Sequence, residues 1–232
     1  WHADTTLSCC RIRTMALDVV TNDASALEDT DLEELASMDE AFSAGQLSKA
    51  KEDWVLITTA RFGNALNGFT FSTLERIGGT PCVLIGLMSV KRSSKRDQVL
   101  RGLMNEAYHR ALMAFPDEDV VVGSRFVNAD AREAFKDLDG VIPSPGDAAG
   151  GEERAWGRRL ARRFSIDKTY EAKLFTATSS AQDGYLDFET ATPEKLDTEL
   201  VEMMSKIPVK KGGAMVVYGW TMAEDLVKLG KR

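Results

Sequence analysis

Residues 83–104 read Val-Leu-Ile-Gly-Leu-Met-Ser-Val-Lys-Arg-Ser-Ser-Lys-Arg-Asp-Gln-Val-Leu-Arg-Gly-Leu-Met. The apolar run ends at Val90, five cationic side chains follow within eleven residues, and a second apolar pattern begins at Val99. The first run predicts a central strand that is covered on both faces. From Val99 the apolar spacing becomes that of a helix, which ends at Pro116. The basic cluster therefore lies where a strand passes into a helix. Such a place favours phosphates, because the first amides of a helix are unpaired and carry the positive end of its dipole.

Upstream of this stretch, the pattern predicts a strand, a helix and two further strands. Thr30 indicates the helix start, since its side chain can cap an open amide while Glu33 reaches back. Gly45 is typical of a helix end. Short links that contain glycine join the next three strands, so we expect an antiparallel meander. The helix stripe consists of Leu32, Leu35, Met38 and Phe42, and the strands are expected at 5–20, 53–61, 68–77 and 81–90.

Downstream, a buried strand is expected at 120–122, followed by a short helix for which Asn128 is a candidate cap. Residues 143–151 are rich in proline, glycine and alanine, which is typical of a loop or linker. We therefore divide the chain into a core over 1–142, a linker over 143–151 and an α/β extension over 152–232. The extension either packs on the core or completes it. It is expected to hold helices at 152–164 and from 192–193, strands near 173–178, 185–189 and 214–220, and a last helix capped by Thr221.

The composition excludes several classes of function. The chain has 232 residues and a net charge of −7, so a protein that coats nucleic acid is not expected. No apolar run approaches the length of about 18 residues that a membrane helix needs. The predicted helix at 152–164 carries five arginines around an apolar stripe. We interpret it as a docked helix with a solvated basic face, and a contact for nucleic acid or an acidic partner is the alternative.

The cysteines and the chain start bear on cellular location. Cys9 and Cys10 are adjacent and Cys82 lies in an apolar run. This spacing predicts neither a disulfide framework nor a zinc site, and no metal site is expected. A reducing cytoplasm fits this cysteine usage. The chain starts with Trp1 and lacks the pattern of a signal peptide, so we expect an incomplete N-terminus; Met15 as a natural start would discard part of the first strand.

The succession of strand, helix, three antiparallel strands, helix, strand and helix over residues 5–140 resembles the GNAT superfamily of acyl-CoA-dependent N-acyltransferases. In that family the fourth strand ends in a valine, as at Val90, and a loop with the pattern Arg/Gln-x-x-Gly-x-Gly/Ala precedes a helix. Here Lys95-Arg96-Asp97-Gln98-Val99-Leu100 occupies that loop position. Farther on, Asn128-Ala-Asp-Ala-Arg-Glu-Ala-Phe135 keeps the spacing of the family's Asn-x-x-Ala-x-x-x-Tyr.

The resemblance implies an α+β fold with a GNAT-like, mixed and mostly antiparallel central sheet flanked by helices, followed by the α/β extension. It implies transfer of an acetyl or other acyl group from acyl-CoA to an amine, carried by a small molecule or a protein. Glu75 is the candidate general base, and Ser89 or Ser124 is a candidate donor to the thioester oxygen or the departing thiolate. The residues implied to bind the acyl-CoA are Leu87, Met88, Val90, Lys95, Arg96, Asp97, Gln98, Val99, Leu100, Arg101 and Asn128.

The sequence departs from the family pattern at three positions. Gln98 and Leu100 replace the two glycines that let the backbone approach a phosphate, and Phe135 replaces the tyrosine that often serves as general acid. These departures support an alternative, a catalytically inactive GNAT-like protein that binds or assembles. The sequence leaves the acceptor, the acyl length and a homodimer open.

Overall fold

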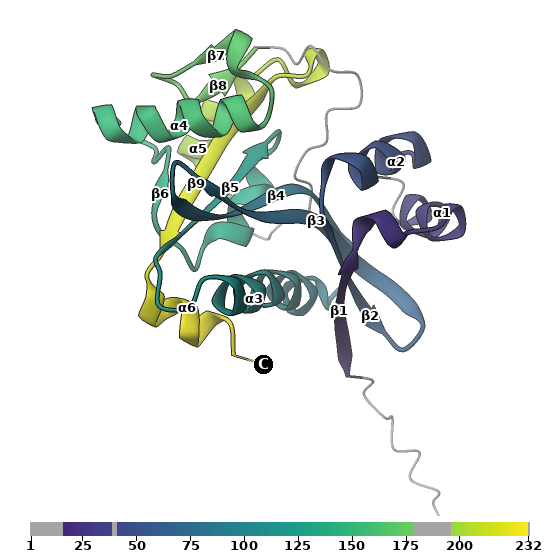
Figure 1. Ribbon diagram of the computed structural model, residues 1–232. Coiled ribbons are helices and arrows are strands. Elements are labelled where there is room, and N and C mark those ends of the chain that lie inside the picture. The colour runs from purple at the N-terminus through teal and green to yellow at the C-terminus, as the bar shows by residue number, and fades with distance from the viewer. Residues whose placement is uncertain (1–15, 39–40, 179–195, 232) are drawn as a thin grey trace, which may run out of the picture.

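The computed structural model describes residues 16–38, 41–178 and 196–231. One nine-stranded sheet forms the centre, in the order β1-β2-β3-β4-β5-β9-β8-β7, and β6 also pairs with β9 (Figure 1). The α+β class and the mostly antiparallel sheet flanked by helices are therefore confirmed. The strands are β1 (Leu17–Asp23), β2 (Leu56–Phe62), β3 (Ala65–Ile77), β4 (Thr80–Val90), β5 (Val120–Phe126), β6 (Asp139–Ile142), β7 (Tyr170–Glu171), β8 (Thr176–Ala177) and β9 (Ala214–Thr221).

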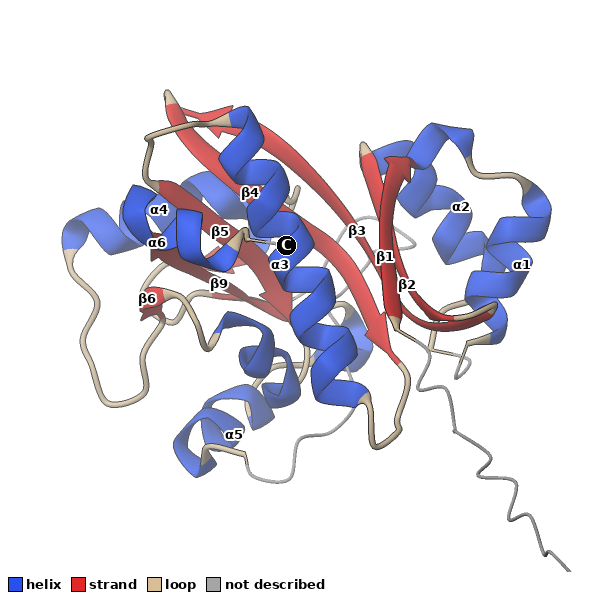
Figure 2. Cartoon of the chain, turned by 90° about the horizontal axis from the view of Figure 1, so that it is seen from below, coloured by secondary structure: helices blue, strands red, loops and turns tan. Residues whose placement is uncertain are grey.

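Helices cover both faces of this sheet (Figure 2). The helix α3 crosses one face, where its Gly102 packs against Leu17 and Val19 of β1. Leu160 of α4 packs against Gly123 of β5 on the opposite face, and α1 and α2 lie beyond β1 and β2 on that same side. The helices are α1 (Asp29–Ser37), α2 (Ala44–Asp53), α3 (Arg96–Ala114), α4 (Gly151–Arg163), α5 (Thr198–Ser205) and α6 (Ala223–Leu229), with 3₁₀ segments η1 (Ala24–Ala26), η2 (Ala129–Phe135), η3 (Asp167–Thr169) and η4 (Val209–Lys211).

The meander β2–β3–β4 forms as predicted, and its last strand is the most buried. Every residue of β4 after Thr80 is buried, in agreement with its continuous apolar run. The pairing of β3 with β4 is interrupted once: Phe71 is opposite Leu87, whereas Ser72 is opposite Ile85. Gly86 is therefore the extra residue of a β-bulge, which bends β4 at that point.

β4 and β5 form a parallel pair, and they part before their ends. They pair from Cys82 with Val121 to Ile85 with Ser124. Beyond that pair, residues 87–90 of β4 are hydrogen-bonded to β3, and the described residues supply no partner on the β5 side. At this last pair, the hydroxyl of Ser124 also donates to the carbonyl of Ile85, at 2.7 Å.

The C-terminal part of the chain joins the same sheet. β9 pairs with β5 from Val120 opposite Thr221 to Phe126 opposite Met215. The helix α4 docks on β9 through Trp156, whose ring centroid lies 6.4 Å from that of Tyr218. Trp156 and Leu160 are buried, whereas the arginines 158, 159 and 162 of α4 are exposed. This is the docked helix with a solvated basic face that the sequence predicts, and the division of the chain at 143–151 stays a prediction.

The predicted helix between Thr30 and Gly45 is wrong in its limits, because two helices occupy this region. Thr30 lies inside α1, which begins after Glu28, and the carboxylate of Asp31 accepts from the amide of Glu28 at 2.8 Å. A second helix starts after Ser43, which forms a capping box with Gln46 and so marks a separate helix start. This second helix, α2, extends to Asp53, so the next strand begins later than predicted.

The last helix also begins differently from the prediction. Thr221 belongs to β9, and the carboxylate of Asp119 accepts from the amide of Ala223 at 2.9 Å. This tertiary contact caps α6 from a residue that sequence spacing could not reveal.

Some predictions lie outside the described residues. They are the strand at 185–189, the helix from 192–193 and residues 5–15 of the first predicted strand. In the described part of the chain, no helix is long and apolar enough to cross a membrane, and no cluster of three metal-ligating side chains occurs.

Candidate functional site

The site expected from the sequence lies where β4 and β5 part. Leu87, Met88 and Val90, implied to contact the acyl-CoA, lie on the parted half of β4, and their side chains are buried. The hydroxyl of Thr70 on β3 donates to the carbonyl of Leu87 at 3.0 Å, so one polar group of the bulged strand is satisfied from the β3 side. The backbone on the β5 side is what an extended ligand could pair with, as an added strand does at a sheet edge.

The basic loop passes directly from β4 into α3. No side chain caps the first turn of α3 in the described part of the chain, which leaves amides open at the positive end of the helix dipole. Within the loop, the hydroxyl of Ser93 accepts from the amide of Lys95 at 3.2 Å, and its carbonyl accepts from the amide of Arg96 at 3.1 Å. The turn is therefore held by Ser93, and α3 begins directly after the loop that follows Val90, as the sequence predicts.

Two cations of this loop, Lys95 and Arg96, contact other side chains of the protein. The Nζ atom of Lys95 lies 3.8 Å from the centre of the Phe62 ring, a cation–π contact of about 0.5–1 kcal/mol at an exposed site. Arg96 forms an ion pair with Asp97, the next residue. Lys91 is exposed. A phosphate group in the loop would thus have to draw Lys95 away from Phe62, at a small free-energy cost.

Gln98 and Leu100, which replace the two glycines of the family pattern, differ in burial. Gln98 and Arg101 are exposed, whereas Val99 and Leu100 are buried on the core stripe of α3. Beside Leu100, between α3 and η2, a groove of about 10 Å³ is lined by Asp97, Leu100, Arg101, Met104, Glu133, Ala134, Lys136 and Asp137. This volume holds about one water molecule, so the groove is closed to a ligand unless side chains move.

Asn128 and Phe135 lie at the two ends of η2. The side-chain oxygen of Asn128 accepts from the amide of Ala131 at 3.2 Å, so Asn128 is the cap of this segment. The ring of Phe135 is fully buried, with its centroid 5.2 Å from that of Phe126 on β5. Sequence analysis missed Tyr108, which lies on α3 and is fully buried; its hydroxyl has no hydrogen-bond partner among the residues that the structure describes. Burial raises the pKa of Tyr108.

The two candidate catalytic residues lie on the same face of the sheet but far apart. Ser89 pairs with Phe69, six residues along β3 from Glu75, and this separation spans about 20 Å. The carboxylate of Glu75 is half-buried and accepts from Nε of Arg163, the last residue of α4, at 2.6 Å. The structure therefore does not bring Glu75 and Ser89 together at one reacting atom, and Glu75 is already paired with a cation.

A second feature that sequence analysis missed is Trp54, the residue that follows α2. A Cβ atom placed on Gly86 would lie 1.9 Å from Cε2 of Trp54, so the indole lies directly on the bulge of β4. The ring centroid of Phe164 is 6.3 Å from that of Trp54, and the guanidinium of Arg163 lies 5.5 Å from the indole centre. The ends of α2 and α4 thus meet over the point where β4 and β5 part. Sequence analysis places Trp54 inside the strand expected at 53–61, so it gives no signal that this side chain contacts Gly86.

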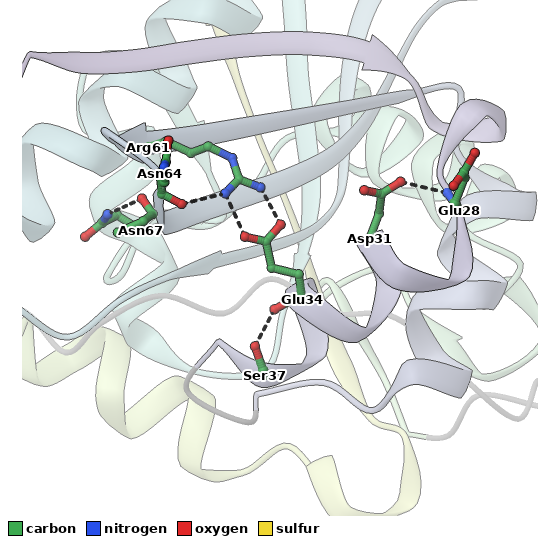
Figure 3. A network of polar contacts seen from close by, with 8 residues as sticks. Glu28, Asp31, Glu34, Ser37, Arg61, Asn64 and Asn67 are labelled. Atoms are coloured by element: carbon green, nitrogen blue, oxygen red, sulfur yellow. Dashed lines mark hydrogen bonds and ion pairs between the residues drawn. The ribbon is translucent and has the colours of Figure 1, made fainter.

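Two larger cavities lie away from this point. One, of about 600 Å³, lies beside Ile142, Pro143, Arg154, Phe175 and Met203. The other, of about 470 Å³, lies between α1 and the strands β1 and β2. Its charged wall includes a two-pronged ion pair in which Arg61 donates to both carboxylate oxygens of Glu34, at 2.7 and 2.5 Å (Figure 3). This pair fastens α1 to β2 and satisfies both charges.

Comparisons with known proteins give no family assignment. No protein-family model matches the chain, and no curated protein matches it. Among solved structures, the chain is similar to the ribosomal-protein-S18-alanine N-acetyltransferase of Escherichia coli, with 15% identity, a TM-score of 0.40, and coverage of 57% of this chain and 80% of that one. It is also similar to an aminoglycoside acetyltransferase from an uncultured soil metagenomic sample in complex with sisomicin, with 16% identity, a TM-score of 0.33, and coverage of 46% and 76%. Neither likeness is strong enough to say what this chain binds.

Proposed function

We propose that this protein is an acyl-CoA-dependent N-acyltransferase, which moves an acetyl or other acyl group to an amine of a small molecule or a protein. The observation that supports the proposal most directly is the parting of β4 from β5 after Ile85 and Ser124. The parted backbone of β4 leads into a basic loop and the uncapped start of α3. One end of this path suits an amide-bearing arm and the other suits phosphates.

The reaction needs little covalent chemistry from the protein. The amine nitrogen attacks the thioester carbonyl carbon, the C–S bond breaks, and the amine loses a proton while CoA leaves as a thiolate. Alignment of the two reactants and polarisation of the carbonyl supply most of the catalysis. Glu75 would take the amine proton through water, after release from Arg163. Because Phe135 has no proton to give and Ser89 lies about 20 Å from Glu75 along β3, the thiolate would be protonated by water.

The path of the acyl-CoA follows from the chemistry of its two ends. Its diphosphate would lie at the loop, against Lys95, Arg96 and the first amides of α3 at Asp97 and Gln98. Its arm would run back along residues 87–90 toward Gly86. The remaining predicted contacts, Val99, Leu100, Arg101 and Asn128, belong to α3 and the cap of η2, at the edge of this path. The cytoplasm and a homodimer remain predictions from the sequence.

A GNAT-like protein without catalysis, which binds or assembles, is the second candidate. The closed groove of about 10 Å³ beside Leu100 and the buried Phe135 favour it. Isothermal titration of the full chain with acetyl-CoA separates the two. We expect binding that weakens in a Lys91→Glu, Lys95→Glu variant and with added salt, since exposed charge contacts are screened. The matched control is Lys206→Glu, an exposed charge swap directly after α5. Absence of binding at millimolar acetyl-CoA would overturn the transferase proposal and leave the second candidate.

A further inference from the structure

We infer that Trp54 limits the length of the acyl group, so that the site accepts acetyl-CoA and excludes donors with long acyl chains. The inference rests on the proposed function, and it adds a residue that sets the substrate class. It depends on three observations: where the bulge lies, what fills the space in front of it, and what holds that filling in place.

The bulge lies at the parting of the two strands. Gly86 comes directly after Ile85, the last residue of β4 that pairs with β5, and it is the residue that the β3–β4 register skips. The diphosphate and the thioester are at opposite ends of the pantetheine arm. If the diphosphate lies at the loop that follows Val90, the arm runs back along β4 and delivers its thioester toward Gly86.

The space in front of Gly86 is filled by an indole. Three atoms of Trp54 lie within 2.4 Å of the place where a Cβ of residue 86 would be. Trp54 is only 6% exposed, and therefore the indole occupies an interior position rather than a surface one. An acyl chain that extends from a thioester at Gly86 on this face meets the indole edge after a short distance.

The indole is held from several sides, so it acts as a fixed wall. The backbone amide of Trp54 donates to the carbonyl of Ala50 at 3.0 Å, which fixes the residue at the end of the last turn of α2. Phe164 packs against one side of the ring, and the guanidinium of Arg163 lies over it. Arg163 is itself held by Glu75 at 2.6 Å. To move the ring, a ligand would have to break contacts with both α2 and α4.

A fixed apolar wall discriminates by size. Each methylene that does not fit such a pocket changes the preference by about tenfold or more. We therefore expect the protein to bind acetyl-CoA at least about a hundredfold more tightly than hexanoyl-CoA. Truncation of Trp54 should remove most of that preference, because the vacated volume can take the additional methylenes.

The test is a calorimetric titration of the full chain with acetyl-CoA and with hexanoyl-CoA. Trp54→Leu should reduce the preference for acetyl-CoA at least about tenfold by tightening hexanoyl-CoA binding, and Trp54→Phe, which keeps an aromatic ring and disturbs the fold less, should have an intermediate effect. Trp156→Leu, which removes an indole from the α4–β9 contact, is the matched control and should leave the preference unchanged. Circular dichroism confirms that each variant is folded.

The outcomes separate this inference from the proposed function. Equal binding of acetyl-CoA and hexanoyl-CoA by the unaltered protein would overturn the inference and leave the transferase proposal intact. A preference that persists in both Trp54 variants would also overturn it. Failure of the unaltered protein to bind either compound would overturn both.

Discussion

Nε of Arg163 lies 2.6 Å from Oε1 of Glu75, and this ion pair joins the last residue of α4 to β3. The pair crosses the boundary that the sequence suggests between the core and the C-terminal extension. It also holds the guanidinium over Trp54, beside the bulge of β4. Glu75 therefore has an evident structural role in addition to the catalytic role that the family resemblance implies.

The two roles of Glu75 predict different effects of substitution. Both Glu75→Gln and Arg163→Met break the ion pair, and each should lower the free energy of unfolding by about 1 kcal/mol or less, because the pair is partly exposed. If Glu75 is the general base, only Glu75→Gln should also lower kcat, by about a hundredfold or more. Urea unfolding and release of CoA thiol from acetyl-CoA measure the two quantities. Equal kcat in the two variants would contradict the catalytic role.

The contact between Trp54 and Gly86 predicts a strong response to one added methyl group. Gly86→Ala should destabilise the protein by about 1–3 kcal/mol, because the new Cβ overlaps a buried ring. Gly45→Ala is the matched control: nothing lies within 4 Å of its Cβ position, and alanine in a helix should stabilise by up to about 1 kcal/mol. Urea unfolding measures both. A Gly86→Ala variant as stable as the unaltered protein would contradict the packing of the indole on the bulge.

The ion pair of Glu34 with Arg61 predicts a pH-dependent contribution to stability. The hydrogen bonds from Arg61 hold the pKa of Glu34 below its ordinary value. The pair therefore stabilises the fold above the unfolded pKa of about 4.3, and this contribution is lost as the pH falls through the lower folded pKa. Glu34→Gln should reduce the free energy of unfolding by less than about 1 kcal/mol at pH 7 and have no effect near pH 2. Glu33→Gln, one residue earlier and exposed, is the control. A difference that grows toward low pH would contradict this sign.

The thiol of Cys82 should be inert in the folded protein. Burial raises its pKa to about 12, so at pH 8 its thiolate population is about a thousandfold smaller than that of a free cysteine. In a Cys9→Ser, Cys10→Ser background, a chromogenic disulfide reagent should react slowly with Cys82 in buffer and rapidly in urea. Rapid reaction in buffer would show that the start of β4 is open to solvent.

The sequence predicts the elements around the candidate site well, for physical reasons. β4 is a continuous apolar run that ends at Val90, whereas α3 has apolar residues at helical spacing from Val99. The change in the apolar pattern therefore separates the strand from the helix clearly. Asn128 caps η2 as its position suggested. In contrast, the helix predicted from Thr30 to Gly45 runs past the end of α1 and includes only the first residues of α2, because Leu32, Leu35, Met38 and Phe42 keep a helical spacing beyond Ser37.

The side-chain packing at the point where β4 and β5 separate could not be predicted from the apolar periodicity of the sequence. Trp54 meets Gly86 only because α2 ends above β4, and Arg163 reaches Glu75 only because α4 docks on the same face. Both contacts join residues far apart in the sequence, and neither residue type signals its partner. The bulge itself depends on the register between β3 and β4, which one strand's sequence does not specify.

The most direct test of the account is amide hydrogen exchange of the full chain with and without acetyl-CoA. If the diphosphate is held at the start of α3 and the arm pairs with the parted strand, acetyl-CoA should slow exchange at Asp97, Gln98 and residues 87–90. The amides of α5 should exchange as before. Unchanged exchange at residues 87–98 in saturating acetyl-CoA would contradict the proposed site.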